Sequence, residues 1–250
     1  MTNIKTKDEI KIMVKAGEIL ANVLKDTQDY IFPLITKNQL DCFIEERIHF
    51  YGGKPAFKNF HGYKYASCIS INEEVVHGIP DDTIIKNGDI VGIDVGVKYN
   101  GYNSDAAITV GIGKISDQAK DLINITKSAL DVAILHIKPG VKLGVIQKKI
   151  QEHVENVGDY SLVRDFSGHG IGKNLQEEPI IPNYFGKNSH LILKENAVFC
   201  IEPMVIIGKN YSVITKNDSW TVISASKNLA AHFEHTIAVT QNGARVLTKI

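Results

Sequence analysis

The sequence predicts an α+β fold made of two related halves, approximately residues 1–112 and 113–250, that share one hydrophobic core. Helix-like segments precede strand-like segments in the first half, and four short patterns of this half recur in the same order in the second. A chain of 250 residues is long enough to bury a large core without a disulfide or a structural metal. No linker or low-complexity stretch separates the halves, so we expect one domain over residues 1–250.

Helices are indicated by capping patterns and by apolar spacing. Thr6 and Glu9 have the spacing of a capping box, and apolar residues follow at helical intervals. Thr36 and Gln39 repeat this pattern before a second helix, which ends near a pair of glycines. A third helical pattern covers residues 117–137 and stops before a Pro-Gly pair. We therefore expect two helices before the first strands and another helix directly after them.

Strand-like segments follow the second helix over residues 67–71, 89–97 and 106–110. Asn100 and Gly101 lie between the last two segments and are typical of a two-residue hairpin turn. The first half of the chain thus predicts two helices followed by three strands, of which two form a hairpin.

The turn also predicts the register of this hairpin. With a two-residue turn at Asn100-Gly101, the numbers of paired residues add up to 201, so Asp105 pairs with Gly96. Gly96 and Asp94 face the same side of their strand because side chains alternate with period two. The carboxylates of Asp94 and Asp105 are therefore predicted to be diagonal neighbours, within ~8 Å, provided that no bulge interrupts the strands.

Four patterns of the first half recur in the second half. In the first of these, displaced by 106 positions, Pro139, Ile146, Ile150, Val154 and Gly158 repeat Pro33, Leu40, Ile44, Ile48 and Gly52. The other three pairs are His77-Gly78-Ile79 with His169-Gly170-Ile171, residues 90–94 with 198–202, and residues 105–110 with 234–239. One such match arises easily by chance, but four matches in the same order indicate an internal duplication.

The repeated strands carry acids that packing does not require. Asp94 and Asp105 lie in apolar strands of the first half, and Glu202 and Glu234 occupy the matching places in the second. Neighbouring buried carboxylates repel each other unless a cation lies between them or one is protonated. Each acid alone could be a solvated strand residue. Four acids with a histidine form a ligand set for divalent ions, and bridging carboxylates would hold two ions ~3.5–4 Å apart.

Two of the nine histidines differ from the others, because His77 and His169 each begin one of the repeated His-Gly-Ile segments. A neutral imidazole can bind a borderline metal, and a second imidazole can relay a proton near neutral pH. The remaining histidines are interpreted as solvated or satisfied core residues: His49, His61, His136, His153, His190, His232 and His235.

Composition excludes several classes of protein. The 28 basic and 28 acidic residues give a net charge of zero, so no basic field attracts nucleic acid or an anionic membrane. Three distant cysteines without a C-x-x-C pair argue against a disulfide framework and a thiolate zinc site. The N-terminus lacks a signal-peptide pattern, and no run of ~18 apolar residues occurs. We expect a cytoplasmic protein without nucleic-acid or membrane partners.

In these acids and histidines and in the residues around them, the chain resembles the bacterial type I methionine aminopeptidases of peptidase family M24. The similar segments are CISINEEVVHGIP, GDIVGIDVGVKYNGYNSDAAITV, SGHGIGKNLQEEP, FCIEPMV and FEHTIAVT, and the resemblance covers essentially the whole chain. It implies the pita-bread fold, in which two pseudo-symmetric halves surround a curved antiparallel sheet. It also implies removal of the initiator methionine from nascent proteins whose second residue is small.

The resemblance further implies two divalent metal ions as cofactors, of Co, Mn, Fe, Zn or Ni. Their ligands would be Asp94, Asp105, His169, Glu202 and Glu234, with Asp105 and Glu234 bridging. A hydroxide held between the ions would attack the scissile carbonyl, and the free α-amine of the substrate would bind the second ion. Glu202 would shuttle the proton.

The substrate is expected to touch residues outside the metal shell. His77 would contact the reacting amide and handle a proton. Gln176 stands where the family usually has a histidine that contacts the carbonyl, and its amide can donate a hydrogen bond there but cannot carry a proton. The methionine pocket, by position, would comprise Phe57, Phe60, Tyr63, Cys68, Leu175 and Trp220, for which plain core packing is the alternative.

Two other functions stay open. A proline-directed peptidase of the same superfamily shares the five ligands, but such relatives usually carry a further N-terminal domain for which 250 residues leave no room. A non-catalytic binding module would be marked by lost ligands, and only Gln176 favours it. The expected partners are N-terminal methionyl peptides and the ribosome exit region, about which a net charge of zero is uninformative, and the family expectation is a monomer.

Overall fold

The computed structural model describes residues 4–249. Within this range the helices are α1 (Lys7–Tyr30), α2 (Lys37–Phe50), the short 3₁₀ helix η1 (Phe60–Gly62), α3 (Asp117–Leu135) and α4 (Leu143–Glu155). The strands are β1 (Lys54–Pro55), β2 (Ser67–Ile71), β3 (Glu74–Val76), β4 (Ile90–Tyr99), β5 (Tyr102–Gly111), β6 (Tyr160–Leu162), β7 (Gly168–Gly170), β8 (Glu177–Ile181), β9 (Val198–Ile201), β10 (Met204–Ile207), β11 (Val213–Thr215), β12 (Val222–Ser224), β13 (Ala230–His232), β14 (Glu234–Thr240) and β15 (Gly243–Val246). None of the helices within residues 4–249 has the length and hydrophobicity of a membrane span.

Helices α1 and α2 begin where the capping patterns predict. Thr6 caps α1 and Thr36 caps α2, and in each case the side chain at the third helical position completes a capping box. Ser116 caps α3 through a bond from the main-chain nitrogen of Ala119. These side chains satisfy main-chain N–H groups that a helix cannot bond internally, which explains why the boundaries are readable from sequence.

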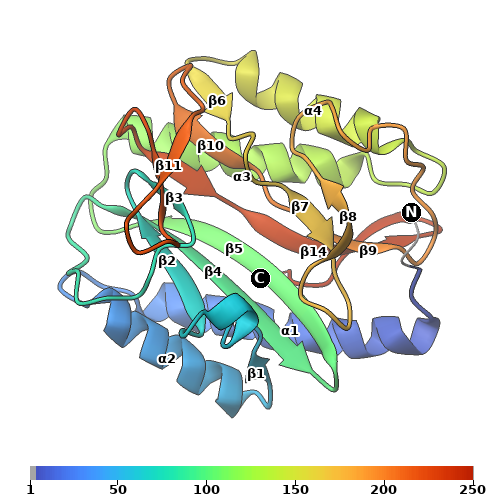
Figure 1. The fold of residues 1–250 in the computed structure, drawn as a ribbon, viewed down its shortest axis with the longest axis horizontal. Coiled ribbons are helices and arrows are strands. Elements are labelled where there is room, and N and C mark those ends of the chain that lie inside the picture. Colours follow the sequence, from blue (N-terminus) through green and yellow to red (C-terminus); the bar gives the residue numbers. More distant parts are fainter. Residues whose placement is uncertain (1–3, 250) are drawn as a thin grey trace.

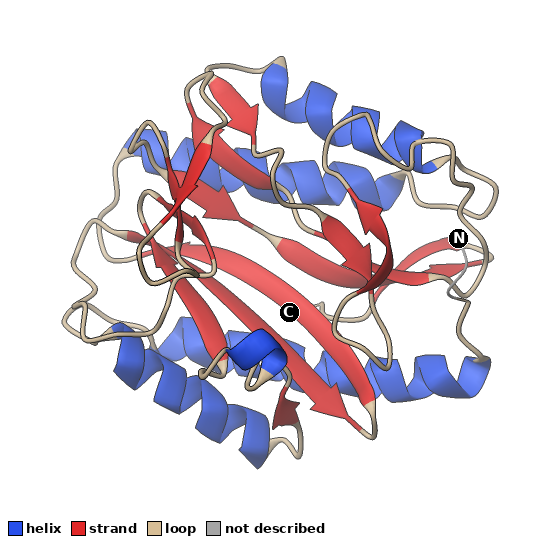
Figure 2. Ribbon diagram, in the orientation of Figure 1, coloured by secondary structure: helices blue, strands red, loops and turns tan. Residues whose placement is uncertain are grey.

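A nine-stranded antiparallel sheet occupies the centre of the molecule. Its strands follow the order β1-β4-β5-β14-β9-β7-β8, with β2 beside β4 and β15 beside β14. In Figure 1 the green strand β5 and the red strand β14 meet in the middle of the sheet. Helices α1 and α2 lie on one side of the view and α3 and α4 on the opposite side (Figure 2). Strands β4 and β9 thus hold matching places on the two sides of the β5–β14 contact.

The hairpin of β4 and β5 has the predicted register, with Asp105 opposite Gly96. Both turn residues, Asn100 and Gly101, have positive φ angles, as a tight two-residue hairpin turn requires. The strands extend to this turn and are longer than the predicted segments. Because no bulge interrupts them, Asp94 and Asp105 lie on one face of the sheet as expected.

The two central strands, β5 and β14, meet along a short seam. Only two pairs of the regular ladder form there, Glu234 with Ala107 and His235 with Ala106. On one side of these pairs the Thr236 hydroxyl accepts a bond from the Asp105 nitrogen at 2.9 Å and donates to its carbonyl at 2.8 Å. On the other side, the Thr109 hydroxyl makes the same two bonds with the main chain of His232, at 3.0 and 2.8 Å. The seam therefore joins the two halves through threonine side chains at both ends.

The main hydrophobic core lies between this sheet and the four α-helices and draws residues from each of them, for example Leu20, Leu40, Leu130 and Ile146. On β4, Ile93 and Val95 belong to this core. Asp94 lies between them and so points to the opposite face, because side chains alternate along a strand. The acids of the central strands are thus turned away from the helices.

Candidate metal centre

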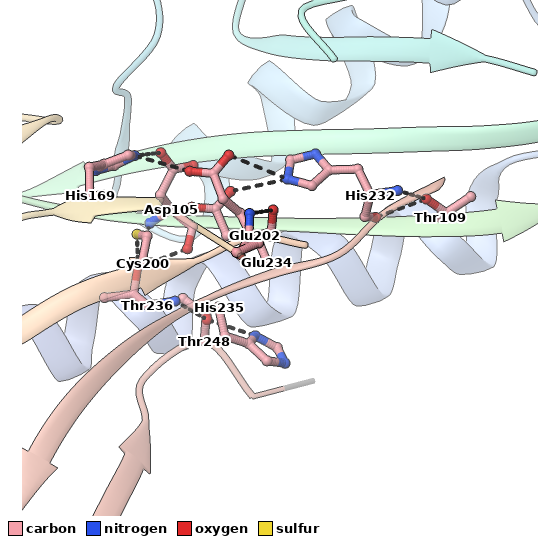
Figure 3. A network of polar contacts seen from close by, with 11 residues as sticks. Asp105, Thr109, His169, Cys200, Glu202, His232, Glu234, His235, Thr236 and Thr248 are labelled. Carbon is pink, nitrogen blue, oxygen red and sulfur yellow. Dashed lines mark hydrogen bonds and ion pairs between the residues drawn. The ribbon is translucent and has the colours of Figure 1, made fainter. Parts of the chain in front are cut away.

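Four acidic side chains converge on the sheet face that the helices leave free. Asp94 comes from β4, Asp105 from β5, Glu234 from β14, and Glu202 directly follows β9. Carboxylate oxygens of Asp94, Asp105 and Glu234 lie within 4.8 Å of one another. Asp105 is 5% exposed and Glu234 2%, and Figure 3 shows both beside Glu202. We call Asp94, Asp105, Glu202 and Glu234 the carboxylate cluster.

The pKa values of all four acids in the carboxylate cluster are raised. Burial raises the pKa of Asp94 to about 7. Burial, and then repulsion from Glu234 and Asp94, raises the pKa of Asp105 well above its usual value. The pKa values of Glu202 and Glu234 are raised in the same way, first by burial and then by neighbouring acids. The ion pairs found for these acids among residues 4–249 involve only histidines, which burial keeps neutral.

Unused ligand atoms point to what would supply that charge. One oxygen each of Asp94, Asp105 and Glu234 is buried and has no hydrogen-bond partner among residues 4–249. A buried acceptor without a partner is costly, so several of them in one place need an explanation. Divalent cations prefer carboxylate oxygens and would satisfy both the orphaned atoms and the excess charge. The donor set therefore fits a metal centre.

His169 adds a nitrogen to this set. Its Nε2 lies 3.9 Å from Oδ2 of Asp105 and 3.8 Å from Oε1 of Glu202. Its Nδ1 is 2.9 Å from the Gly170 carbonyl, which can only accept, so Nδ1 carries the proton and donates it. Burial lowers the pKa of His169, so the ring stays neutral and its Nε2 lone pair faces the carboxylates. A metal-binding histidine typically has its other nitrogen held in this way.

Neighbouring groups fix the main chain around the cluster. Thr236 bonds both main-chain groups of Asp105 across the seam. The Asn183 amide donates to the main-chain carbonyl of Glu202 at 3.0 Å. The Cys200 thiol lies 3.5 Å from the Thr236 hydroxyl, and its Sγ falls within ligand distance of His169 and Glu234 atoms. Burial raises the pKa of this thiol well above normal, so it stays protonated.

One histidine of the site, His232, was not singled out from the sequence. It is buried, yet its Nε2 has no hydrogen-bond partner within the described part of the chain, so the interpretation as a satisfied core residue is wrong. The ring faces Glu202 and Glu234, at 3.8 and 3.9 Å. Burial lowers its pKa to about 3, with His77 adding to the effect. His232 ends β13 and Glu234 begins β14, so strand alternation along the chain gave no signal for this contact.

His77 lies at the edge of this region. It has a positive φ of 58° and packs edge-to-face on Phe166, with ring centroids 5.3 Å apart. Burial lowers its pKa, so the imidazole is neutral. The next residue must be glycine, since a Cβ on Gly78 would lie 2.2 Å from the carbonyl oxygen of Ile69. The repeated His-Gly-Ile segment thus serves close packing as well as placing His77.

The six residues predicted to form a pocket do come together. They form one apolar cluster, in which Phe57, Tyr63, Cys68 and Leu175 are buried and Phe60 and Trp220 are partly buried. The rings of Tyr63 and Trp220 meet edge-to-face at 4.9 Å. Cys68 on β2 pairs directly with Asp94 on β4, so the apolar cluster adjoins the carboxylates.

Gln176 lies in a bend just before β8 and is exposed. Its neighbour Leu175 belongs to the apolar cluster, which places the bend beside the predicted pocket. The bend follows β7, the strand that carries His169.

Comparison with known proteins agrees with this arrangement. The profile of metallopeptidase family M24 matches residues 11–241. Methionine aminopeptidase 1 of Bacillus subtilis is 43% identical over 246 residues, which is 98% of each chain. The crystal structure of methionine aminopeptidase from Thermotoga maritima matches with a TM-score of 0.96 and 43% identity, over 100% of both chains. Prolidase from Pyrococcus furiosus matches with a TM-score of 0.78 and 27% identity, over 99% of this chain and 65% of that one.

Proposed function

Since the chain belongs to metallopeptidase family M24, among its methionine aminopeptidases, we propose that the carboxylate cluster and His169 form its catalytic metal centre. The predicted family and the pita-bread fold are confirmed. The protein is a metal-dependent aminopeptidase that removes the initiator methionine. The observation that carries the assignment of the site is the convergence of four acids, two buried and two partly buried, with the free nitrogen of a neutral histidine.

We assign the ligands as Asp94, Asp105, His169, Glu202 and Glu234, with Asp105 and Glu234 shared between two ions. Asp105 and Glu234 come from opposite sides of the seam and each has an orphaned oxygen, which supports a shared role. Divalent ions bound here would polarise the substrate carbonyl and lower the pKa of the attacking water. Co, Mn, Fe, Zn and Ni all suit a shell of carboxylates with imidazole.

Three side chains are proposed to transfer protons or to hydrogen-bond the substrate. Glu202 is proposed to accept the proton of the attacking water and pass it to the leaving amine, because its carboxylate lies among the proposed ligands and burial raises its pKa, which favours proton uptake. His77 would donate a hydrogen bond to the reacting amide. Gln176 would donate one to the carbonyl oxygen, on which negative charge develops.

The apolar cluster is the proposed methionine pocket. Its aromatic rings and Leu175 offer the polarisable, water-excluding wall that a thioether side chain favours. Crowding near the carboxylates would restrict the second residue of the substrate to small side chains such as Gly, Ala and Ser.

We further propose that residues 1–250 act as one catalytic domain and as a monomer. Because the substrates are nascent chains, the enzyme would work in the cytoplasm close to the ribosome exit region. The seam supports the single domain, since β5 and β14 come from different halves yet complete one site.

A peptide assay tests this function. With Co²⁺ present, we expect release of methionine from Met-Ala-Ser, tolerance of norleucine at the first position, and no cleavage when the α-amine is acetylated. An apolar pocket separates such isosteres by only ~1–3 kcal/mol, so norleucine should be a slower substrate rather than an inert one. Efficient cleavage of Ala-Pro peptides without a preference for methionine would instead assign the chain to the proline-directed peptidases, whose fold it shares.

A further inference from the structure

His232 faces the carboxylate cluster with an unused nitrogen. Its Nε2 lies 3.8 Å from Oε2 of Glu202 and 3.9 Å from Oε2 of Glu234. The residue is 4% exposed, and this atom has no hydrogen-bond partner among residues 4–249. Both distances are too long for hydrogen bonds. The ring therefore points at the carboxylates without being satisfied by them.

The position of His232 mirrors that of His169. Each ring has its Nε2 at 3.8 Å from a different oxygen of Glu202 and at 3.9 Å from a second acid, Asp105 for His169 and Glu234 for His232. Figure 3 shows the two rings on either side of the acids. Two ligand atoms that are each ~2.1 Å from one ion can be at most ~4.2 Å apart. The Nε2 atom of each ring is therefore close enough to both of its carboxylate oxygens to share an ion with them.

The main chain of His232 is held firmly. Thr109 bonds both its nitrogen and its carbonyl oxygen across the seam, and β13 pairs it with Met204 of β10. Met204 lies two residues beyond Glu202, so the same strand pairing ties together the imidazole and the acid that it faces. A side chain on such a rigid support suits a precise ligand position.

We propose that His232 is a further metal ligand, which binds one of the ions together with Glu202 and Glu234. The inference rests on the proposed function, because it assumes that the carboxylate cluster holds divalent ions. It gives the centre two imidazoles instead of one. Because imidazole suits Zn, Co, Ni and Fe better than it suits Mn or Mg, His232 would bias the centre towards the former group.

The decisive measurement is the number of imidazole ligands in the zinc-loaded protein, from X-ray absorption spectroscopy. We expect two imidazoles per chain in the natural protein, and half that signal in His232→Gln and in His169→Gln. His235→Gln is the matched control, since His235 is a partly buried histidine on β14 whose Nδ1 contacts the Thr248 hydroxyl at 3.0 Å. It should keep the full signal.

Metal affinity provides a second readout. His232→Gln should weaken Zn²⁺ binding at least ~10-fold and Mn²⁺ binding less. A single imidazole per chain in the natural protein would overturn the proposal, and this count needs no variant to fold. An unchanged signal in folded His232→Gln would overturn it as well. If the natural protein bound no zinc at all, the proposed function itself would fail, which separates the two conclusions.

Discussion

His169 and His232 lie on opposite sides of the Glu202 carboxylate, each with its Nε2 3.8 Å from a different oxygen of that group. Glu202 follows β9, whereas the two rings come from β7 and β13. The Glu202 carboxylate thus lies between two imidazoles that come from different strands. A shift of the Glu202 carboxylate should therefore change its distances to both His169 and His232.

Removing one shared acid should abolish activity without unfolding the protein. Glu234→Gln keeps the volume of the side chain but loses a negative charge, and Asp105→Ala removes the other shared ligand. In the metal-free protein, Glu234→Gln relieves repulsion among buried acids, so we expect the melting temperature to rise by about 2–4 °C. Calorimetry with and without chelator measures this, and Glu46→Gln, at an exposed acid on α2, is the control. Full activity in either variant would contradict the shared-ligand assignment.

The metal-free protein should lose stability as the pH rises through neutrality. Burial raises the pKa of Asp94 to about 7 from 3.8. A group whose pKa is higher when folded stabilises the protein fully below its unfolded pKa and loses that contribution as the pH passes its folded pKa. Asp94→Asn removes this dependence, so its unfolding free energy should increase relative to the natural protein from about pH 4 to about pH 8. Urea titrations at several pH values would show the trend, and a constant difference would count against it.

The Thr236 hydroxyl should matter for both stability and metal binding. Thr236→Val keeps the shape but leaves the nitrogen and carbonyl of Asp105 without their partner. Each unsatisfied buried group costs about 1–3 kcal/mol, so we expect a loss of at least about 2 kcal/mol and weaker metal binding. Thr236→Ser retains the hydroxyl and should remain close to the natural protein. Equal stability of the two variants by urea unfolding would show that the bridge is dispensable.

Gln176 should limit the rate of reaction. A charged donor hydrogen-bonds about twice as strongly as a neutral amide, so Gln176→His should raise kcat, by ~10-fold, with little change in metal affinity. It should also add an ionisation near neutral pH to the rate profile. Gln176→Ala should lower kcat, because no donor remains. If the alanine variant is as active as the natural protein in steady-state assays, Gln176 does not touch the reacting carbonyl.

The relative positions of the carboxylates are predictable from the sequence, because side chains alternate regularly along a strand and the turn determines the register. The turn at Asn100-Gly101 determines which residues pair, and that register places Asp94 and Asp105 on one face. The duplication then predicts where Glu202 and Glu234 lie, because β9 and β14 repeat β4 and β5. Local rules and an internal repeat were sufficient for this part of the site.

The role of His232 was not predictable in the same way. β13 ends at His232 and β14 begins at Glu234, and no turn or repeat in the sequence predicts the register across this break. The ring reaches Glu202 through the pairing of β13 with β10, and Thr109 of β5 holds its main chain across the seam from 123 residues away. Such long-range pairing has no local signal. The sequence therefore could not separate His232 from a satisfied core histidine.

A metal titration of the metal-free protein tests the catalytic metal centre, with two readouts taken together: Co²⁺ bound per chain and methionine released from Met-Ala-Ser. We predict no release without metal, recovery of activity as Co²⁺ is added, and saturation of binding at two ions per chain. Glu234→Gln should bind fewer ions and stay inactive. Release of methionine at the full rate by the metal-free protein, or saturation without activity, would contradict the assignment of the carboxylate cluster as the catalytic metal centre.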